Sequence, residues 1–472
     1  MMAEVDVAGV SLWGMEIGAL AWNPEKKVGE FQYTPEFLDT PFELAPLKMP
    51  KSPRVYGFPG LNEETFKGLP GMLADSLPDR FGNQLINAWL ARQGRKPNSF
   101  NPVERLCYVG RRGMGALEYT PASGPRAATD APIAVEELVR LSNKVLSDRG
   151  ASSARLDEEV DEAAMQQILQ VGTSVGGARA KAIIAWNEET GEVRSGQLDL
   201  GEGFGHWILK LDGITENRDK EGSDPQGYCA REYVYYLMAR EAGMEMAECR
   251  LMEENGRRHF LTRRFDRVAA PAEPGERAGD KIFMQSLCAL GHYDYNTPGS
   301  VSYDELFLDM ETLGLGRAAA EEQFRRLVFN VLAMNRDDHT KNASFLMDKA
   351  GQWRLSPAYD VTFAFNPTGD FTSEHQMTIN GKADDITRAD LEAIAKRAGV
   401  SRQARDRIID QVIEAVTRWP ALSEEYGVPE ALIKEADQGL ALARRSFLGE
   451  TPGHDSHVGA RKNPAGRTRG NY

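Results

Sequence analysis

The segment from Asp337 to Asn342, followed by Asp360, holds the residue types that phosphate transfer from ATP requires. Its six residues read Asp-Asp-His-Thr-Lys-Asn and come after an apolar helical run over residues 327–334. In such transfers one carboxylate orients or deprotonates the acceptor hydroxyl, while an Asn and a second Asp hold Mg²⁺ through oxygen ligands. We therefore expect Asp337 to be the catalytic carboxylate and Asn342 and Asp360 to be the metal ligands. The Asp-to-Asn spacing equals that of the protein-kinase catalytic loop.

The alternative for this segment is a solvated, charged turn after a helix, in which Asp337 or Asp338 helps to cap. The Asp-x-x-x-x-Asn spacing alone is common by chance. We favour catalysis because the spacing occurs together with Asp360 and with the upstream features described below. His339 and Lys341 are further candidates for contact with the nucleotide. His339 has a structural alternative, in which it packs against or bonds the loop backbone, and Lys341 either meets the transferring phosphate or is solvated.

A glycine-containing segment upstream could bind phosphate through its backbone. Residues 172–181 read Gly-Thr-Ser-Val-Gly-Gly-Ala-Arg-Ala-Lys. The paired glycines let backbone N–H groups approach an anion without interference from Cβ atoms. The segment lacks the Gly-x-x-x-x-Gly-Lys-Ser/Thr pattern of a Walker A loop. Its alternative is a plain turn between a helix and a strand. The candidate nucleotide-binding residues here are Ser174, Val175, Gly176 and Gly177.

Lys210 interrupts an apolar strand pattern over residues 207–211. A lysine in this position either extends to solvent from the polar face of a sheet or points towards phosphates. The glycine segment before it and the acids after it favour the second interpretation. Glu232, near the start of the next predicted helix, either pairs with Lys210, as the helix glutamate does in kinases, or is an exposed first-turn acid that suits the helix dipole.

Arg263 and Phe265 lie where a predicted strand runs into a loop, which is where a hinge between two lobes would fall. Backbone groups at a hinge could bond adenine, and Phe265 could cover the face of the ring. The alternative is the end of a hairpin, with Phe265 in the hydrophobic core. The sequence supports the two interpretations equally.

The composition restricts the class of protein. The chain has 472 residues, with 56 Lys and Arg against 70 Asp and Glu, a net charge of −14. A globally acidic protein is poorly suited to gripping nucleic acid with its whole surface, although a local basic patch is compatible with this charge. The four cysteines are scattered, which favours reduced thiols over a disulfide framework or a metal site. We see no signal-peptide pattern and no apolar run of membrane-spanning length, so we expect a cytoplasmic protein without membrane contact.

The order of elements along the chain predicts an α+β protein. Residues 1–125 read as short strands with a helix, including a hairpin over residues 7–22. Residues 135–265 read as antiparallel strands with the glycine segment, and helices dominate residues 266–450. Residues 451–472 have few apolar residues, so we expect them to be disordered. Strands followed by mostly helices are the order that a bilobal, protein-kinase-like fold needs, whereas a Rossmann fold needs regular strand–helix alternation.

Taken together, these residues resemble the HipA family, the serine/threonine-kinase toxins of bacterial toxin–antitoxin modules. The resemblance spans nearly the whole chain, and its most specific segments are the two that contain Asp337 and Asp360. The segments that carry it are residues 75–82, 174–181, 207–210, 262–267, 335–342 and 355–361.

The resemblance implies a fold and a site. A small β-rich N-terminal subdomain would join a kinase N-lobe, and an all-helical C-lobe would follow. Asp337 would be the catalytic base, Asn342 and Asp360 the Mg²⁺ ligands, and Lys210 the lysine that contacts the phosphates of ATP. Ser174 would be the site of autophosphorylation.

The resemblance also implies partners. Family members are typically paired with a small helix-turn-helix antitoxin (HipB-like) that binds operator DNA, so contact with DNA would be indirect. Their known targets are aminoacyl-tRNA synthetases, whose phosphorylation blocks tRNA charging and translation. At the hinge this chain has Arg263 where the best-known member has an acid. A backbone contact to adenine would survive that change, and a side-chain contact would not.

Two rival classes of function stay open at this point. A small-molecule kinase of the aminoglycoside or sugar type shares the Asp-x-x-x-x-Asn arrangement. A non-catalytic co-repressor, acting together with an antitoxin, would not need the acids at all, and the intact acids argue against it.

Overall fold

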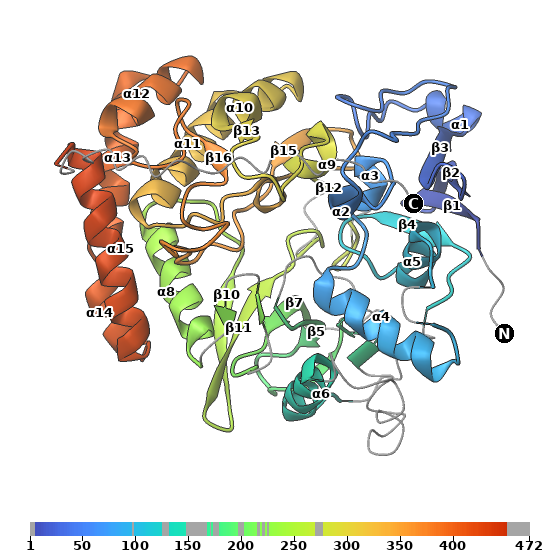
Figure 1. The fold of residues 1–472 in the computed structure, drawn as a ribbon, viewed down its shortest axis with the longest axis horizontal. Helices are drawn as coiled ribbons and strands as arrows, with labels where there is room; N and C mark the ends of the chain where they lie inside the picture. The colour runs from blue at the N-terminus through green and yellow to red at the C-terminus, as the bar shows by residue number, and fades with distance from the viewer. Residues whose placement is uncertain are drawn as a thin grey trace, which may run out of the picture.

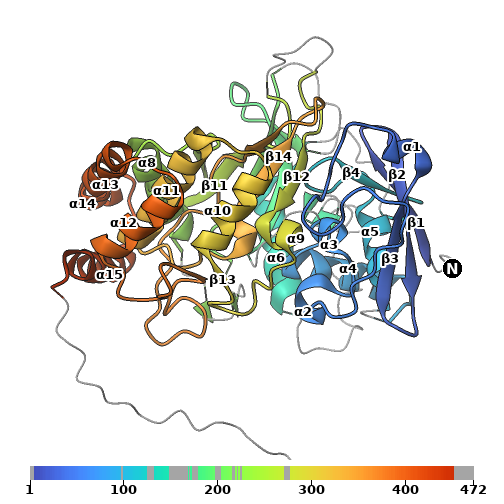
Figure 2. The same cartoon turned by 90° about the horizontal axis from the view of Figure 1, so that it is seen from above.

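The structure is a computed structural model, and it describes residues 5–96, 99–124, 132–147, 168–169, 171–172, 179–196, 203–214, 218–219, 222–223, 226–269 and 277–450. Within this part of the chain the fold is α+β, as expected. An N-terminal sheet lies at one end of the molecule and a group of helices from the C-terminal part at the other (Figures 1 and 2). Residues 173–178 of the glycine segment and the tail from residue 451 lie outside the described residues.

The N-terminal sheet is antiparallel, with the strand order β3-β2-β1-β4. The predicted hairpin is confirmed as β1 (Val7–Leu12) and β2 (Met15–Asn23), followed by β3 (Val28–Tyr33) and, much later in the chain, β4 (Leu117–Thr120). Alternate residues of β1 are fully buried, so one face of the sheet packs on a core. Short helices cover that face: α1 (Pro35–Leu38), α2 (Glu63–Phe66), α3 (Gly71–Ala74) and α5 (Pro102–Val109).

A second antiparallel sheet has the order β10-β11-β7-β5-β6. Its strands are β5 (Lys181–Trp186), β6 (Val193–Ser195), β7 (Gly205–Lys210), β10 (Cys249–Glu254) and β11 (Arg257–Arg263). The two-residue strands β8 (Arg218–Asp219) and β9 (Gly222–Ser223) form a separate pair. The pattern of apolar residues at 207–211 therefore predicted a strand correctly.

Helices α4 (Arg80–Arg92) and α6 (Val135–Ser147) share one hydrophobic core with this second sheet. Phe81 and Leu85 of α4 are buried in the same cluster as Trp207 and Leu209 of β7. This core crosses the boundary that we expect near residue 125, and the domain limits stay a prediction.

The largest core is formed by helices of the C-terminal part together with α8 (Tyr228–Glu241). Thr387 and Asp390 form a capping box at the start of α12. The helices are α10 (Tyr303–Thr312), α11 (Arg317–Leu332), α12 (Arg388–Arg397), α13 (Arg402–Val416), α14 (Trp419–Glu425) and α15 (Glu430–Leu448).

The expectation that residues 266–450 are all-helical is wrong. A small antiparallel sheet is formed there by β12 (Phe283–Ser286), β14 (Ser344–Met347) and β15 (Trp353–Leu355), and α9 (Leu287–Gly291) follows β12 directly. A parallel pair joins β13 (Val301–Ser302) to β16 (Met377–Thr378). Apolar runs of three or four residues are too short for periodicity to separate a strand from a buried helix turn. The strands matter for the site because β14 starts two residues after Asn342.

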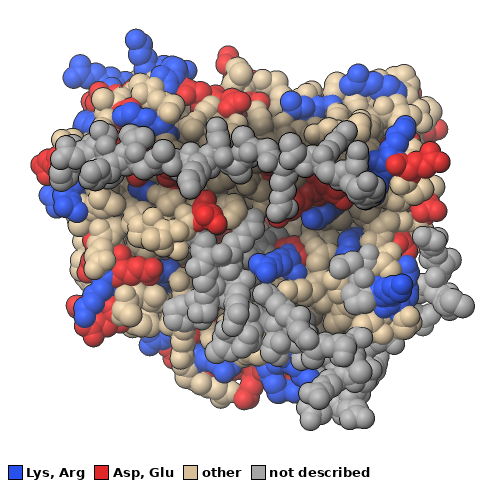
Figure 3. Space-filling model, viewed as in Figure 1, with Lys and Arg blue, Asp and Glu red and all other residues tan. Residues whose placement is uncertain are grey.

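The expectations about thiols and membranes can also be compared with the structure. All four cysteines are free and buried. None of the described helices is both long and apolar enough to cross a membrane. Acidic and basic side chains are interspersed over the described part of the face in Figure 3, without a large area of one sign.

Candidate active site

The segment that contains Asp337 begins where α11 ends. Met334 adopts a left-handed conformation with φ 53°, which turns the chain out of the helix. The backbone N–H of Asn335 then donates to the carbonyl of Asn330 (3.0 Å), and that of Arg336 donates to the carbonyl of Ala364 (3.1 Å). The segment is therefore tied to its own helix on one side and to the chain after Asp360 on the other. We call residues 335–342 the catalytic loop.

Asp337 and Asn342 are held at the two ends of one short turn. The side-chain amide of Asn342 donates through Nδ2 to the carbonyl oxygen of Asp337 (2.7 Å). Because the amide nitrogen is used in this way, Oδ1 of Asn342 is directed elsewhere and can act as an oxygen ligand. The Asp337 side chain is 47% exposed, so its carboxylate can be reached from solvent, and Nε2 of His339 lies 3.7 Å from its Oδ1.

Asp338, in contrast, is a buried anchor. Its carboxylate accepts hydrogen bonds from the hydroxyl of Tyr303 (2.8 Å) and from the backbone N–H of Gln376 (2.8 Å). Nδ1 of His375 lies 2.9 Å from the same carboxylate. The side chain of Asp338 is only 1% exposed. For Asp338 the capping alternative is thus replaced by cross-linking of the loop to α10 and to the segment before β16, while the role of Asp337 stays a prediction.

Lys210 connects the second sheet to α8 and to Asp360. Its Nζ donates to Oε1 of Glu232 (2.5 Å) and also contacts Oδ1 of Asp360. The pairing of Lys210 with Glu232 is confirmed, and the exposed first-turn alternative for Glu232 is excluded because that residue is 3% exposed. Lys210 of β7, Glu232 of α8 and Asp360 therefore form one ion-pair cluster.

The charges in this cluster shift each other's protonation. Burial alone would raise the pKa of Asp360, but the nearby ammonium groups of Lys210 and Lys181 outweigh it and hold that pKa well below its ordinary value. Burial alone would lower the pKa of Lys210, and the two carboxylates raise it instead. Asp360 is thus a carboxylate and Lys210 an ammonium at neutral pH, as metal binding and phosphate binding respectively require.

Lys181 is a member of this cluster that the sequence reasoning did not select. It lies opposite Lys210 in the register of β5 and β7, and it is 4% exposed. Burial lowers its pKa, the charge of Asp360 opposes this, and the charge of Lys210 adds to it. Its place as the last residue of the glycine-containing segment was the available signal, since a buried lysine beside a phosphate-binding loop is well suited to contact phosphate.

Asp79 is a second residue that was missed. Its Oδ1 accepts from the backbone N–H of Gly82 (2.6 Å) at the N-terminus of α4. Burial raises the pKa of Asp79 to about 7, and the charges of Lys181 and Lys341 act in the opposite direction. An acid from the N-terminal 125 residues is therefore electrostatically coupled to two candidate site lysines.

Tyr359 links the catalytic loop to Asp360. The hydroxyl of Tyr359 donates to the carbonyl oxygen of Lys341 (2.5 Å). In the chain, Tyr359 immediately precedes Asp360. Asp360 itself has a left-handed backbone with φ 52°, which is uncommon for a residue with a side chain and often marks a functional position. Nζ of Lys341 lies 5.1 Å from the centroid of the Tyr295 ring, so Lys341 is not simply solvated.

At the expected hinge, the two candidates have different environments. Arg263 forms an ion pair with Glu248, with 3.2 Å between Nη1 and Oε2, and it lies beside the Trp207 ring. Phe265 is half-buried, and its ring centroid is 5.4 Å from that of Tyr359. Phe265 is thus next to the segment that carries Asp360, while the side chain of Arg263 is already paired. Their roles in nucleotide binding stay predictions.

A buried ion cluster fixes the chain just after the hinge. Asp266 is fully buried between Arg264 and Arg267, with 2.7 Å from a guanidinium nitrogen of each to its Oδ2. Oδ2 also accepts from the backbone N–H of Gly115 (2.8 Å), which belongs to the N-terminal part. Burial would raise the pKa of Asp266, and the two arginines hold it far below its usual range. No pattern in the sequence predicts that residues 264–267 bind the N-terminal part.

The site as described can supply oxygen ligands but not a complete metal cage. Among the residues that the structure describes, no three or more His, Cys, Asp and Glu side chains are grouped as a metal site. Mg²⁺ in kinases is held by one or two protein side chains, with phosphates and water completing the shell, so Asn342 and Asp360 fit that requirement. The candidates Ser174, Val175, Gly176 and Gly177 fall outside the described residues.

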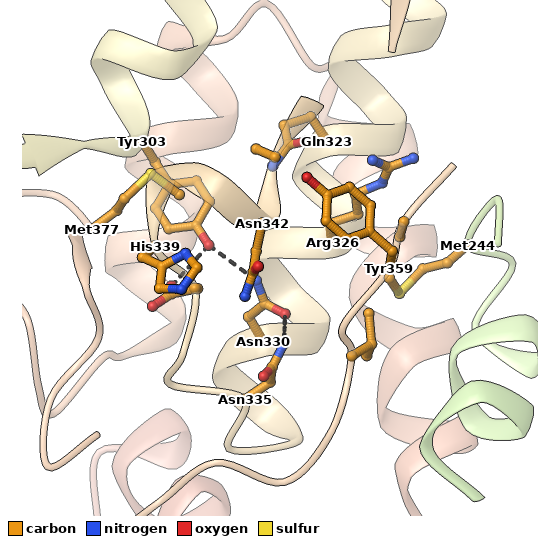
Figure 4. Close-up of a pocket in the computed structure, with 14 residues that line it drawn as sticks. Met244, Tyr303, Gln323, Arg326, Asn330, Asn335, His339, Asn342, Tyr359 and Met377 are labelled. Atoms are coloured by element: carbon orange, nitrogen blue, oxygen red, sulfur yellow. Dashed lines mark hydrogen bonds between the residues drawn. The ribbon is translucent and has the colours of Figure 1, made fainter. Parts of the chain in front are cut away.

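A small polar cavity lies under the catalytic loop (Figure 4). Its volume is about 30 Å³, and both the loop and the helices α10 and α11 contribute to its wall. The polar residues that line it are Tyr303, Gln323, Arg326, Asn330, Asn335, Asp338, His339, Asn342 and Tyr359.

Comparisons with known proteins cover both parts of the chain. The HipA N-terminal domain matches residues 8–120, and the HipA-like C-terminal domain matches residues 173–419. The "Serine/threonine-protein kinase toxin HipA" of Shewanella oneidensis is 25% identical over 218 residues, which are 41% of this chain and 49% of that protein. The "Putative kinase Y4mE" of Sinorhizobium fredii is 26% identical over 224 residues, 45% of this chain and 48% of that protein. The chain spans about half the length of the curated relatives it matches.

The fold has a counterpart among solved structures. HipA in a complex with HipB and operator DNA, from Shewanella oneidensis MR-1, superimposes with a TM-score of 0.61 at 20% identity. The match covers 94% of this chain and 97% of that one. At this identity the likeness establishes the fold alone. Since the C-terminal domain match by itself spans more than half of the 472 residues, the chain belongs to the HipA family, in which relatives are named as kinases.

Proposed function

We propose that this protein is an ATP- and Mg²⁺-dependent serine/threonine-protein kinase. The observation that carries the proposal is the position of Lys210, whose Nζ contacts both Glu232 and Asp360. The arrangement supports the proposal because protein kinases need a lysine, a helix glutamate and a metal-binding aspartate in place before phosphate transfer. The bond from Tyr359 to the carbonyl of Lys341, which holds the catalytic loop beside Asp360, supports the inclusion of Asp337 and Asn342.

The roles of the residues follow from their environments. Lys210, assisted by the buried Lys181, would neutralise phosphate charge, and Asn342 and Asp360 would supply oxygen ligands to Mg²⁺. The metal, when bound, offsets the charge that develops on the phosphoryl group. Asp337 is exposed enough to accept the proton of an incoming hydroxyl, or to orient that hydroxyl, while Asp338 keeps the loop in place. Catalysis then consists mostly of positioning and charge stabilisation.

The remaining expectations are part of this proposal. The nucleotide would lie between an N-lobe built on the five-stranded sheet and a C-lobe built on α8 and α10–α15, with Phe265 near the adenine. Ser174 would be phosphorylated by the protein itself. A helix-turn-helix antitoxin would neutralise the kinase and connect it to DNA, and a translation component such as an aminoacyl-tRNA synthetase would be the substrate. The HipA–HipB–DNA complex of the structural relative supports the antitoxin part.

Transfer of labelled phosphate from ATP tests the proposal. Purified protein with Mg²⁺ and γ-labelled ATP, incubated with bacterial lysate, is expected to label discrete protein bands. Asp337→Asn should reduce this labelling by about 10²–10⁴-fold, the usual contribution of a catalytic acid or base. Labelling by Asp337→Asn at the wild-type rate would refute the assignment. Transfer to small metabolites with no labelled protein would instead indicate a small-molecule kinase.

Ser174 has its own test. Intact-mass and peptide mass spectrometry of the active protein, before and after incubation with ATP, should show one added phosphate on the peptide that contains Ser174. The Ser174→Ala variant should lack it. Phosphate mapped only to other residues would reject this part of the proposal.

A further inference from the structure

A series of side-chain hydrogen bonds runs from Asn335, at the start of the catalytic loop, to Asp338 within it. Nδ2 of Asn335 donates to Oδ1 of Asn330 (2.8 Å), and Nδ2 of Asn330 donates to the hydroxyl of Tyr303 (3.1 Å). The hydroxyl of Tyr303 donates to Oδ2 of Asp338 (2.8 Å). Figure 4 shows the links between Asn335, Asn330 and Tyr303 beside the polar cavity. We call these four residues the relay chain.

The direction of every bond in the relay chain follows from its last member. A carboxylate only accepts, so Tyr303 must use its single hydrogen towards Asp338. The oxygen of Tyr303 is then an acceptor, which requires Asn330 to present its amide nitrogen to it. The carbonyl oxygen of Asn330 consequently faces Asn335, which must donate. Reversing the amide of Asn330 would break two bonds and reversing that of Asn335 would break one, so the chain has one consistent arrangement.

Three of the four residues of the relay chain are buried. Tyr303 is fully buried, and Asn335 and Asp338 are 4% and 3% exposed when the whole residue is counted, while Asn330 is half-buried. Burial, together with the charge of Asp338, raises the pKa of Tyr303 well above its ordinary value, so its hydroxyl stays a donor. In surroundings of low dielectric constant such bonds are stronger than in water, and an interrupted chain leaves polar groups without compensation.

The relay chain joins the elements that surround Asp337. Tyr303 is the first residue of α10, and Asn330 lies in the last turn of α11. Asn335 and Asp338 lie on either side of Asp337 in the catalytic loop. Because both are fixed by side-chain bonds, the backbone between them, which carries Asp337, has little freedom to move.

We propose that Tyr303 and Asn330 are positioning residues, which hold Asp337 in its reactive place through Asp338 and Asn335. The proposal rests on the assignment of Asp337 as the carboxylate that meets the acceptor hydroxyl. Neither Tyr303 nor Asn330 touches the substrate in this arrangement. Their contribution is mainly to the turnover rate and not to the affinity for nucleotide, because Lys210, Glu232 and Asp360 are held by contacts with one another and not by the relay chain.

Tyr303→Phe is the informative variant, because it removes one oxygen atom and keeps the ring. With purified protein, Mg²⁺ and ATP, kcat for phosphate transfer should fall by about tenfold, since displacement of a catalytic group by a fraction of an ångström has an effect of this order. KM for ATP should stay within twofold of the wild-type value. Tyr293→Phe is the matched control, because Tyr293 makes a similar bond to Asp309 (2.9 Å) in the same part of the molecule, away from the relay chain.

The double variant tests whether the two residues act as one unit. Asn330→Leu alone should lower kcat severalfold, and Asn330→Leu combined with Tyr303→Phe should lower it no further than Tyr303→Phe does, because one interruption already disconnects the chain. Thermal unfolding identifies any variant that fails to fold. A Tyr303→Phe enzyme with kcat within twofold of wild type, losses that simply multiply in the double variant, or an equal loss in Tyr293→Phe would overturn the proposal. If the wild-type protein transfers no phosphate, the proposed function fails instead.

Discussion

Asp337 and Asp338 are neighbours in the chain and occupy opposite environments. The side chain of Asp337 is 47% exposed, whereas that of Asp338 is 1% exposed and holds a tyrosine hydroxyl and a backbone N–H. The carboxylate of Asp337 is accessible from solvent, whereas the carboxylate of Asp338 is buried and holds the loop through hydrogen bonds. This division separates the effects of two substitutions that look alike in the sequence.

Asp338→Asn should destabilise the protein, while Asp337→Asn should not. An amide at position 338 turns one acceptor into a donor that faces the donors already there, at a cost of about 2–3 kcal/mol. At position 337 the amide meets solvent, and the free energy of unfolding should change by less than about 0.5 kcal/mol. Urea unfolding of both variants checks this. Equal stabilities would show that Asp338 is not the anchor of the loop.

Lys210→Met should destabilise the fold in a pH-dependent manner. It leaves the carboxylates of Glu232 and Asp360 with Lys181 as the remaining nearby cation, and breaking a buried ion pair from one side costs about 3 kcal/mol. The pKa of Asp360 is depressed in the folded wild-type protein, so its contribution to stability is present above the pKa of the unfolded chain and is lost as pH falls.

The difference in unfolding free energy between wild type and Lys210→Met should therefore be large at pH 7.5 and smaller at about pH 2.5, because the contribution of Asp360 is lost only below its ordinary pKa of 3.8. Chemical denaturation at both pH values measures it. A pH-independent difference would mean that lost packing, and not lost charge, is responsible. Lys26, whose pair with Glu30 is exposed, supplies a control position, where methionine should have little effect at either pH.

Asp266→Asn should weaken the attachment of residues 264–267 to the N-terminal part and lower the free energy of unfolding. It leaves Arg264 and Arg267 buried without a counter-ion and weakens the bond from Gly115, at an expected cost of about 3–5 kcal/mol. Glu137→Gln, in the largely exposed pair with Arg140, should cost less than about 0.5 kcal/mol. Thermal unfolding compares the two variants. Similar midpoints would contradict a structural role for the buried cluster.

Buried histidines should make the fold sensitive to mild acid. Burial lowers the pKa of His206, His259 and His292 to about 4, from an ordinary value of 6.5. The unfolded chain binds protons at these positions below pH 6.5 and the folded protein only near pH 4, so stability is complete above pH 6.5 and falls between the two values.

His292 offers the test, because its Nε2 accepts from the backbone N–H of Gly71 (3.1 Å) and must be neutral to do so. Replacing one such histidine with Gln should reduce the dependence of unfolding free energy on pH by up to about 1.4 kcal/mol per pH unit between pH 6 and 4.5. Urea titrations at several pH values measure this slope. An unchanged slope would show that His292 is protonated in the fold.

The residues that the sequence identified best are those whose type and local pattern agree. Lys210 within an apolar strand and Glu232 at a helix start were each ambiguous alone, and the register of β7 against its neighbours and the place of α8 bring them into contact. The chemistry of carboxylate, amide and lysine side chains indicated which partners to look for. The spacing of apolar residues predicted the hairpin and the long helices because the pattern is repeated over many residues.

What the sequence did not show depends on contacts between distant segments. The bond between Asp266 and Gly115 joins residues 151 positions apart, and no local pattern around either residue predicts it. The relay chain needs Tyr303 and Asp338 to meet, and the sequence shows only a tyrosine after a serine and the second of two aspartates. The strands β12 and β14 were missed because their pairing, and not their own pattern, makes them strands.

The N-terminal part packs against the five-stranded sheet and also against the C-terminal part of the chain. Phe283, Cys288 and Met347 are buried with the N-terminal sheet, while α4 is buried with the five-stranded sheet. The stretch between these attachments, near Asp75, is itself tethered to Ser286 (2.6 Å). If the two lobes proposed above move relative to each other, the bond between Asp75 and Ser286 and the attachment of Asp266 to Gly115 must both be strained, so we expect this movement to be stiffer than with a single connection.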